Sequence, residues 1–186
     1  MTMDTTDLEL LRLVSRGDEH AFEALYARHA RALLAYAEGL LGERGPAEEA
    51  LQETFIAVWR GAASFEERSL VRTWLFGICR RQALKRMRGH LPAPRPLDDA
   101  LDLPSSEPGP QAVALARADA AAVAAALGTL APLHREVFDL AFAAEMSHAE
   151  IAEVLGIPVG TVKSRLFNAR AALARALPVV VEEAGR

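Results

Sequence analysis

Residues 147–170 of this chain read SHAEIAEVLGIPVGTVKSRLFNAR, and they specify how the second half folds. Ser147 and Glu150 have the spacing of a capping box, in which the serine side chain accepts a hydrogen bond from a backbone amide of the first helical turn and the glutamate reaches back to the cap. The box predicts a short helix over residues 149–155. Gly156 then ends that helix, because glycine readily adopts the left-handed conformation that often follows a helix.

The residues after Gly156 predict a second, longer helix. Ile157 and Pro158 turn the chain, and helical spacing then continues through Thr161 as far as Leu177. A short helix, a glycine turn and a basic helix together are typical of a helix-turn-helix, whose second helix enters the major groove of DNA. The sequence therefore predicts a DNA-binding domain in the second half of the chain.

Further helices are predicted by apolar residues at intervals of three and four. In the first half they cover residues 21–41, 46–60 and 71–87, with Pro46 at the first position of its helix. In the second half an Ala-rich helix is expected over residues 111–127, and another follows Pro132. The inward stripe of the first helix comprises Phe22, Leu25, Tyr26, His29, Leu33, Leu34, Ala37, Leu40 and Leu41. The inward residues of helix 71–87 are Trp74, Leu75, Ile78, Leu84 and Met87.

The helical pattern stops between residues 89 and 110, where six of the ten prolines fall. Proline removes a backbone donor and fixes φ, so this stretch predicts an extended tether instead of a helix. The expected fold class is therefore all-α, with two helical domains joined by a Pro-rich linker. We expect domains at residues 1–89 and 111–178, a linker at 90–110 and a tail at 179–186.

Charge is distributed unevenly along this chain of 186 residues, whose formal net charge is −4. Residues 72–88 contain six Arg or Lys residues and no acid, and residues 159–181 contain four and again no acid. Acidic residues gather around 43–53, 98–102 and the two chain ends. Two basic faces on an acidic body predict two separate nucleic-acid contacts, with acidic surface left for a protein partner.

Composition also argues against several other classes of protein. No stretch approaches the roughly 18 uninterrupted apolar residues that span a bilayer, and the first residues are acidic where a signal peptide would be basic. We therefore expect a cytoplasmic chain with no membrane insertion. Cys79 is the single cysteine, and the five histidines lack the paired spacing of metal ligands, so neither a disulfide, a metal site nor a cofactor is expected.

Three blocks of sequence resemble the extracytoplasmic-function sigma factors, the smallest members of the primary-sigma-related family. The first block is Ser15-Arg16-Gly17-Asp18 with Ala21-Phe22 and Leu25-Tyr26. The second runs over residues 47–55 and continues with Trp59-Arg60, Phe65 and Thr73-Trp74-Leu75. The third comprises residues 130–135, Glu150-Ile151-Ala152, residues 160–166 and Ala169-Arg170. Together the blocks cover most of residues 7–177 outside the linker, and they occur in the family's order. The resemblance implies a subunit that gives RNA polymerase its promoter specificity and performs no catalysis itself.

The resemblance also implies protein partners. In such proteins the helix that holds Glu49, Gln52, Glu53 and Ile56 docks on core RNA polymerase. An acidic, partly apolar helix face suits this role, because it can pair with a basic coiled coil. The family further implies control by an anti-sigma factor that competes for the same acidic and apolar surfaces.

The third helix and the loop before it are expected to bind the proximal promoter element. The resemblance implies that residues 61–69 capture a base flipped out of the locally melted strand, which offsets the cost of unstacking it. Two positions depart from the family pattern, because Arg81 replaces a usual Asn and Lys85 a frequent Asp. Trp74 is expected to be a core aromatic and not a base-stacking residue. The expected contact residues are Phe65, Arg72, Arg80, Arg81, Lys85 and Arg88.

The recognition helix is expected to read the distal promoter element as double-stranded DNA. A basic side chain suits guanine acceptors, and an apolar ring suits a thymine methyl group. Asn168 replaces a frequent Arg and so removes one charge-assisted phosphate contact. The expected contact residues are Thr161, Lys163, Ser164, Arg165, Phe167, Asn168 and Arg170.

Two other classes of protein are weighed against this interpretation. A helix-turn-helix activator or repressor with a helical sensing domain shares the second domain, but its first domain should show a ligand pocket or a phosphoacceptor site. An enzyme should show a His-Glu helix pair, a Gly-rich phosphate loop or a nucleophile elbow. Cys79 instead has the helical register of a core residue.

Overall fold

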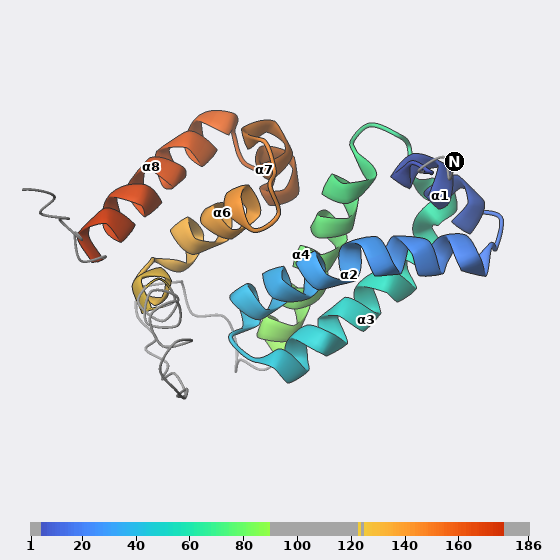
Figure 1. Cartoon of the computed structure of the whole chain (residues 1–186), viewed down its shortest axis with the longest axis horizontal. Helices are drawn as coiled ribbons and strands as arrows, with labels where there is room; N and C mark the ends of the chain where they lie inside the picture. Colours follow the sequence, from blue (N-terminus) through green and yellow to red (C-terminus); the bar gives the residue numbers. More distant parts are fainter. Residues whose placement is uncertain (1–4, 90–122, 124, 177–186) are drawn as a thin grey trace, which may run out of the picture.

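A computed structural model describes residues 5–89, 123 and 125–176, in which the regular structure is helical throughout. The first half contributes α1 (Asp7–Val14), α2 (Glu19–Leu41), α3 (Arg44–Gly61), a 3-10 turn (Ala62–Ser64) and α4 (Val71–Gly89). The second half contributes α6 (Pro132–Phe142), α7 (His148–Leu155) and α8 (Val159–Ala176). We call α1–α4 the N-terminal bundle and α6–α8 the C-terminal group; Figure 1 shows them side by side. No helix in the described ranges is both long and apolar enough to cross a membrane.

The predicted all-α fold class is confirmed by these helices. The expected linker at residues 90–110 and the tail at 179–186 lie outside the described residues, as does most of the expected helix at 111–127. The domain bounds that were drawn from the sequence therefore stay a prediction.

Short polar segments set the start of α1 and α2. Thr6 and Glu9 form a capping box at α1, with the Thr6 amide donating to Glu9 Oε2 over 2.8 Å. Gly17 has a φ of +86°, a left-handed conformation that favours glycine, and it turns the chain between the helices. Asp18 then caps α2 by accepting from the amide of Ala21 over 2.9 Å. The turn and the cap together explain why the stretch from Arg16 to Asp18 suits this junction.

The α3 helix begins two residues before the position predicted from Pro46. Its first residue is Arg44, so Pro46 occupies the third helical position. A proline is tolerated anywhere in the first turn, since the amides there have no partner within the helix. Because the helix starts at Arg44, its first turn contains no acidic residue; Glu48 lies in the following turn, where it accepts from Arg44 over 2.8 Å.

The centre of the N-terminal bundle is built from aliphatic and aromatic side chains of α2, α3 and α4. Leu25, Leu33, Val58, Leu75 and Phe76 are almost completely excluded from solvent. Burying each such side chain contributes about 1.5–3 kcal/mol relative to exposure.

Two residues expected to point inward do not. Tyr26 is 45% exposed, because its ring packs on Phe55 at the rim of the core, with centroids 4.7 Å apart. Met87 is exposed near the C-terminal end of α4. His29, in contrast, is buried as expected and is hydrogen-bonded through Nε2 to Asp7 Oδ2 over 2.8 Å.

The two groups of helices contact each other directly, with α2 against α6 and α4 against α7. One continuous cluster of buried apolar residues includes Leu33 and Phe76 from the N-terminal bundle and Val137, Leu140 and Ile151 from the C-terminal group. A smaller cluster, formed by Ala126, Leu130, Ala169 and Leu173, supports α8. The described conformation of the chain is therefore a closed one.

Cys79 lies in the core of the N-terminal bundle. Its Sγ atom is 3.7 Å from the carbonyl oxygen of Leu33, and the residue is fully buried. Burial raises the pKa of Cys79 to about 11, outweighing a hydrogen bond with Thr54 that lowers it. The thiol is therefore protonated at neutral pH and unreactive.

We predict that Cys79 of the folded chain reacts with a disulfide reagent at pH 8 about 100-fold more slowly than in the urea-unfolded chain, because thiolate is scarce and access is blocked. The release of chromophore from one thiol per chain measures both rates. Equal rates in the two states would contradict the buried placement.

Candidate nucleic-acid interfaces

The predicted capping box is formed at the start of α7. The Ser147 Oγ accepts from the Glu150 amide over 3.3 Å, and the Ser147 amide donates to Glu150 Oε2 over 2.8 Å. Gly156 ends the helix with a φ of +66°, as the sequence predicts. The amide of Ile157 donates back to the carbonyl of Ala152 over 3.0 Å, which closes the turn before α8.

Helix α8 is held by one apolar stripe, which directs its other faces outward. Val162, Leu166, Ala169 and Leu173 are buried at spacings of four, three and four residues. Thr161 and Arg165 are partly buried at the edges of this stripe. The remaining residues predicted to contact the distal element are exposed: Lys163, Ser164, Phe167, Asn168 and Arg170.

The outer face of α8 is cationic and carries an exposed aromatic ring. No acidic residue occurs in Val159–Ala176, and Phe167 is 73% exposed. The Ser164 hydroxyl donates to the carbonyl of Thr161 over 3.0 Å, which leaves its oxygen free to accept. The Arg170 guanidinium stacks over the Phe142 ring at 5.4 Å and is thereby oriented. A face of this kind can hold phosphates and contact a thymine methyl group.

The basic residues of α4 that were predicted to contact the proximal element divide between two faces of the helix. Arg81, Lys85 and Arg88 are exposed and share one face, because they lie four and three residues apart. Arg72 and Arg80 are partly buried and turn toward the C-terminal group. The structure therefore does not gather the predicted proximal-element residues on one free surface.

Arg72 and Arg80 each bind a carboxylate of the C-terminal group. Arg72 Nη2 donates to Glu150 Oε1 over 2.7 Å, and Arg80 Nε donates to Glu136 Oε1 over 2.8 Å. The Tyr36 hydroxyl donates to the same Glu136 oxygen over 3.0 Å. These carboxylates were not predicted from the sequence, since nothing in the local pattern around Glu136 marks a partner 56 residues away.

The loop before α4 is held against the rest of the N-terminal bundle by an aromatic contact and by an ion pair with α1. The rings of Phe65 and Trp74 pack with centroids 5.1 Å apart, so Trp74 belongs to this packing as expected. Glu67 has a φ of +56°, a conformation that is uncommon for residues other than glycine. The guanidinium of Arg12 on α1 binds both Glu67 carboxylate oxygens, over 2.7 and 2.9 Å, and ties the loop to the bundle.

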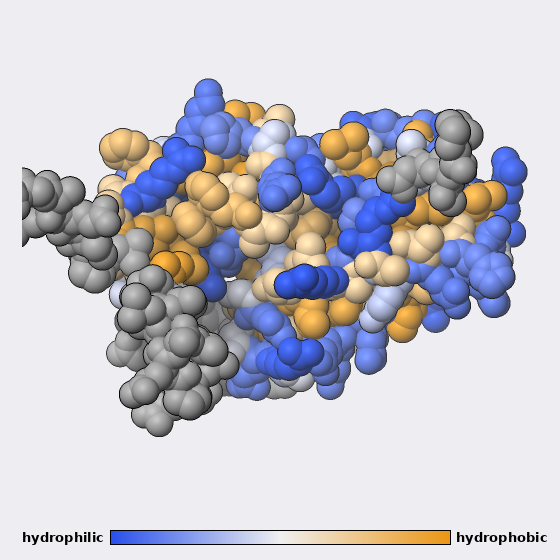
Figure 2. Space-filling model, in the orientation of Figure 1, coloured by the Kyte–Doolittle hydropathy of each residue, from blue (hydrophilic) through white to orange (hydrophobic). Residues whose placement is uncertain are grey.

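The acidic face predicted on α3 is exposed and has aromatic neighbours. Glu49, Gln52, Glu53 and Ile56 all lie on the solvent side of α3, and Glu49 forms an ion pair with Arg86 of α4. Tyr26 and Trp59 are exposed residues of the same aromatic cluster, which also contains Phe22 and Phe55. Figure 2 shows that apolar residues reach the surface of the N-terminal bundle among hydrophilic ones. We call residues 49, 52, 53 and 56 with Tyr26 and Trp59 the α3 patch.

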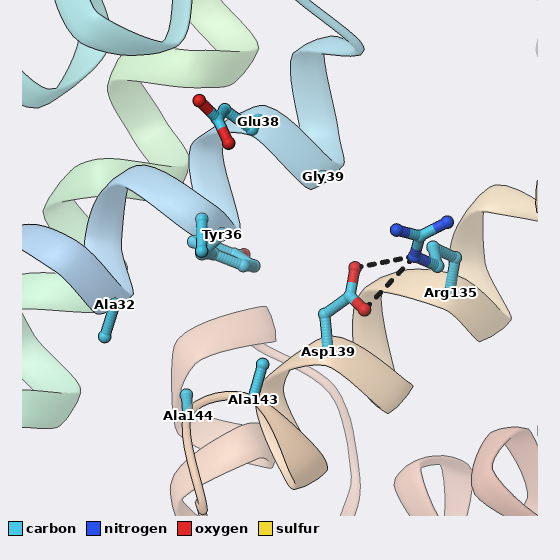
Figure 3. Close-up of a pocket in the computed structure, with 9 residues that line it drawn as sticks. Ala32, Tyr36, Glu38, Gly39, Arg135, Asp139, Ala143 and Ala144 are labelled. Atoms are coloured by element: carbon cyan, nitrogen blue, oxygen red, sulfur yellow. Dashed lines mark hydrogen bonds and ion pairs between the residues drawn. The ribbon is translucent and has the colours of Figure 1, made fainter. Parts of the chain in front are cut away.

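A pocket of about 340 Å³ lies between α2 and α6 (Figure 3). Its wall includes Tyr36 and Gly39 on one side and Arg135 and Asp139 on the other. Burial raises the pKa of Asp139, although Arg135 opposes this by donating to its carboxylate over 2.9 Å. Within the described ranges, no three His, Cys, Asp or Glu side chains are grouped so as to hold a metal ion.

Comparison with known families matches the two halves of the chain separately. The family model described as Sigma-70 region 2 matches residues 25–90, and the one described as Sigma-70, region 4 matches residues 120–173. The chain is 35% identical over 178 residues to RNA polymerase sigma factor NccH of Alcaligenes xylosoxydans xylosoxydans, covering 93% of this chain and 95% of that protein. It is 35% identical over 176 residues to ECF RNA polymerase sigma factor SigM of Mycobacterium tuberculosis, covering 94% and 86%.

Two solved structures share the fold over most of their length. The structure of CnrH in complex with the cytosolic domain of CnrY has a TM-score of 0.67 and 30% identity, covering 91% of this chain and 95% of that one. The sigma factor RpoE in complex with the anti-sigma factor NepR from Bartonella quintana has a TM-score of 0.64 and 26% identity, covering 86% and 98%.

We predict that Ser147→Ala loosens α7 at its start, because it removes the side-chain acceptor of the capping box. The expected cost is about 1 kcal/mol, measured as weaker hydrogen-exchange protection of the first amides of α7. The control is Ser164→Ala, whose hydroxyl caps nothing. Unchanged protection in Ser147→Ala would show that the box does not stabilise the helix.

Proposed function

Because this chain belongs to the RNA polymerase sigma factors of the extracytoplasmic-function (ECF) group, we propose that it binds core RNA polymerase and directs it to particular promoters. The observation that carries this proposal is the presence, in one chain, of a helix-turn-helix that matches region 4 and of a bundle that matches region 2. A helix-turn-helix regulator with a sensing domain would have no need of the region 2 bundle. The proposed role requires no covalent chemistry from this chain and places it in the cytoplasm, with polymerase and chromosome.

In this proposal, the outer face of α8 reads the distal promoter element. Lys163 and Arg165 supply positive charge, and the exposed ring of Phe167 supplies an apolar contact. Thr161, Ser164, Asn168 and Arg170 add neutral and charged donors along the groove. The arrangement is supported by the absence of acids on α8, because a carboxylate there would repel phosphates.

The N-terminal bundle would act at the proximal element, where the duplex melts. Arg81, Lys85 and Arg88 form an exposed basic row on α4 that suits backbone phosphates. The loop before α4, with Phe65 at its base, would receive an unpaired base. Arg72 and Arg80 would join these contacts once they are released from the C-terminal group.

The α3 patch would be the main contact with core RNA polymerase. It combines carboxylates with exposed aromatic and aliphatic side chains, a composition found where protein partners dock. We further propose an anti-sigma factor as a regulatory partner that covers the same surfaces. Residues 90–110 would serve as the tether that lets the domains at 1–89 and 111–178 reach separate DNA elements, since an extended chain spans about 3.3–3.6 Å per residue.

The proposed function is tested by run-off transcription with core polymerase, with and without this chain, on genomic fragments. We expect transcripts that start at discrete promoters only when the chain is present. Transcription that is unaffected by the chain, together with operator binding by the chain alone, would point instead to an ordinary repressor or activator.

Replacing Lys163 and Arg165 with Ala should weaken promoter-specific initiation by about tenfold or more, because each base or phosphate contact is worth about 1–3 kcal/mol. The salt dependence of promoter binding should also flatten, by about one in log–log slope for each phosphate that the variant no longer binds. Arg175→Ala, a basic residue near the end of α8 that we assign to no DNA contact, is the matched control. Unchanged promoter occupancy in the double variant would contradict the assignment.

Replacing Gln52 and Glu53 with Lys should abolish co-purification with core polymerase, since like charges placed across an interface cost several kcal/mol. Glu23→Lys reverses an exposed charge on α2 outside the α3 patch and should leave binding intact. Retention of core polymerase by the double variant would remove the docking role of α3.

A further inference from the structure

An ion pair joins α1 to the loop that precedes α4. The Arg12 guanidinium donates from Nε to Glu67 Oε1 over 3.0 Å and from Nη2 to both carboxylate oxygens, over 2.7 and 2.9 Å. Two nitrogens thus meet both oxygens, and this fork geometry fixes the direction of the glutamate side chain as well as its distance. The two residues lie 55 positions apart, so the pair connects segments that only folding brings together.

Glu67 has a backbone conformation that needs such support. Its φ of +56° belongs to the left-handed region, which residues with a Cβ atom adopt only at a cost. A conformation of that kind persists where the surrounding structure holds it. The neighbouring ion pair between Glu66 and Arg68 is confined to the loop itself. Arg12 therefore supplies an anchor from outside the loop.

Helix α1 is itself held firmly against the bundle. Leu11 is 1% exposed and belongs to the main apolar core. At the start of the helix, Asp7 forms an ion pair with Arg28 of α2 and a hydrogen bond with His29. The helix also contacts α4 and the 3-10 turn that leads into the loop. The last turn of α1, which carries Arg12, is thus a fixed point for the loop.

The ends of the loop are packed, whereas its middle is exposed. Phe65 stacks on Trp74 at one end, and Val71 is buried at the other, where α4 begins. Between them, residues 66–68 and 70 are exposed, and Leu70 is 61% exposed. The pair with Arg12 meets the loop in the middle of this exposed stretch. It therefore acts on the part of the loop that is free to meet a ligand.

The exposure of the pair separates its local effect from any effect on global stability. The side chains of Arg12 and Glu67 are 57% and 46% exposed. Ion pairs in such positions contribute little to the stability of the whole fold, because water screens them. A short loop is a different matter, since one fixed side chain restricts many of its conformations. A loop ordered in advance binds more tightly, because less conformational entropy is lost when the ligand arrives.

We propose that Arg12 is a positioning residue for promoter melting, because its ion pair with Glu67 holds residues 65–70 in the conformation that receives the unpaired base. This inference rests on the proposed function and assigns a role to a residue of α1 outside the expected DNA contacts. An Arg12 that acted only through its charge near DNA would behave differently. In that case the loss of Arg12 and the loss of Glu67 would have opposite effects.

The first test observes the loop in the free chain. Arg12→Ala should lower the backbone order parameters of residues 66–69 from about 0.85 to below about 0.6, as measured by NMR relaxation of their amides. The amides of α4 should keep their values. The matched control is Arg44→Ala, which removes an exposed arginine that is paired with Glu48 inside α3. Unchanged order parameters in Arg12→Ala would overturn the inference.

The second test is run-off transcription with core polymerase from one promoter that the wild-type chain recognises. Arg12→Ala and Glu67→Ala should each lower initiation by about fivefold. The double variant should lower it no further, because either change breaks the same pair. The two single changes alter the net charge in opposite directions. Loss of initiation in Arg12→Ala together with a gain in Glu67→Ala would reveal a charge effect and overturn the inference.

Promoters that lack single bases distinguish base capture from a general defect. Each base of the non-template strand of the proximal element is removed in turn, and the abasic position that lowers wild-type initiation most marks the captured base. At that position Arg12→Ala and wild type should initiate equally well, because the contact made by the loop is missing from both. A defect of the same size on the intact and the abasic promoter would contradict the positioning role.

The failure of the inference and the failure of the proposed function give different results. Inactivity of the wild-type chain on every promoter fragment would remove the proposed function and this inference with it. Activity of the wild type alongside full activity of both single variants would overturn the inference alone.

Discussion

A carboxylate that is almost completely buried needs a cationic partner, and this requirement at Glu136 determines how the two groups of helices meet. Leaving a charge buried and unpaired costs several kcal/mol, which is a large part of the net stability of a small protein. Arg80 and the Tyr36 hydroxyl supply the partners, so α6 can dock on α2 and α4 in few orientations. The Arg72–Glu150 pair, formed by α4 and α7, follows from that docking and fixes it at a second point.

The sequence predicted those parts of the fold that depend on local chemistry. The Ser147–Glu150 cap, the Gly156 turn and the three helices predicted in the first half follow from residues within one or two turns of each other, and the structure contains them, whereas α1 was not predicted. The early start of α3 was missed, because the first turn accepts Pro46 at more than one position. The exposure of Tyr26 was missed as well, since helical spacing alone does not distinguish a core residue from one at its rim.

The candidate site was predictable in its composition and not in its arrangement. The exposed faces of α8 and α3 follow from the apolar stripes opposite them, so Lys163 and Gln52 lie outward as expected. The separation of Arg72 and Arg80 from the other basic residues of α4 depends on partners 78 and 56 residues away. No local pattern encodes such contacts. A run of basic residues in a sequence therefore shows how many positive charges a nucleic acid could contact. It does not show how many of them are paired with carboxylates elsewhere in the chain.

The two carboxylate oxygens of Glu150 form hydrogen bonds with different parts of the chain. One oxygen completes the cap of α7 through the Ser147 amide, while the other binds Arg72. Loss of the bond to Arg72 would leave the bond to the Ser147 amide in place, so the start of α7 does not depend on the contact with α4. The start of α7 is thus held by contacts within the helix-turn-helix itself.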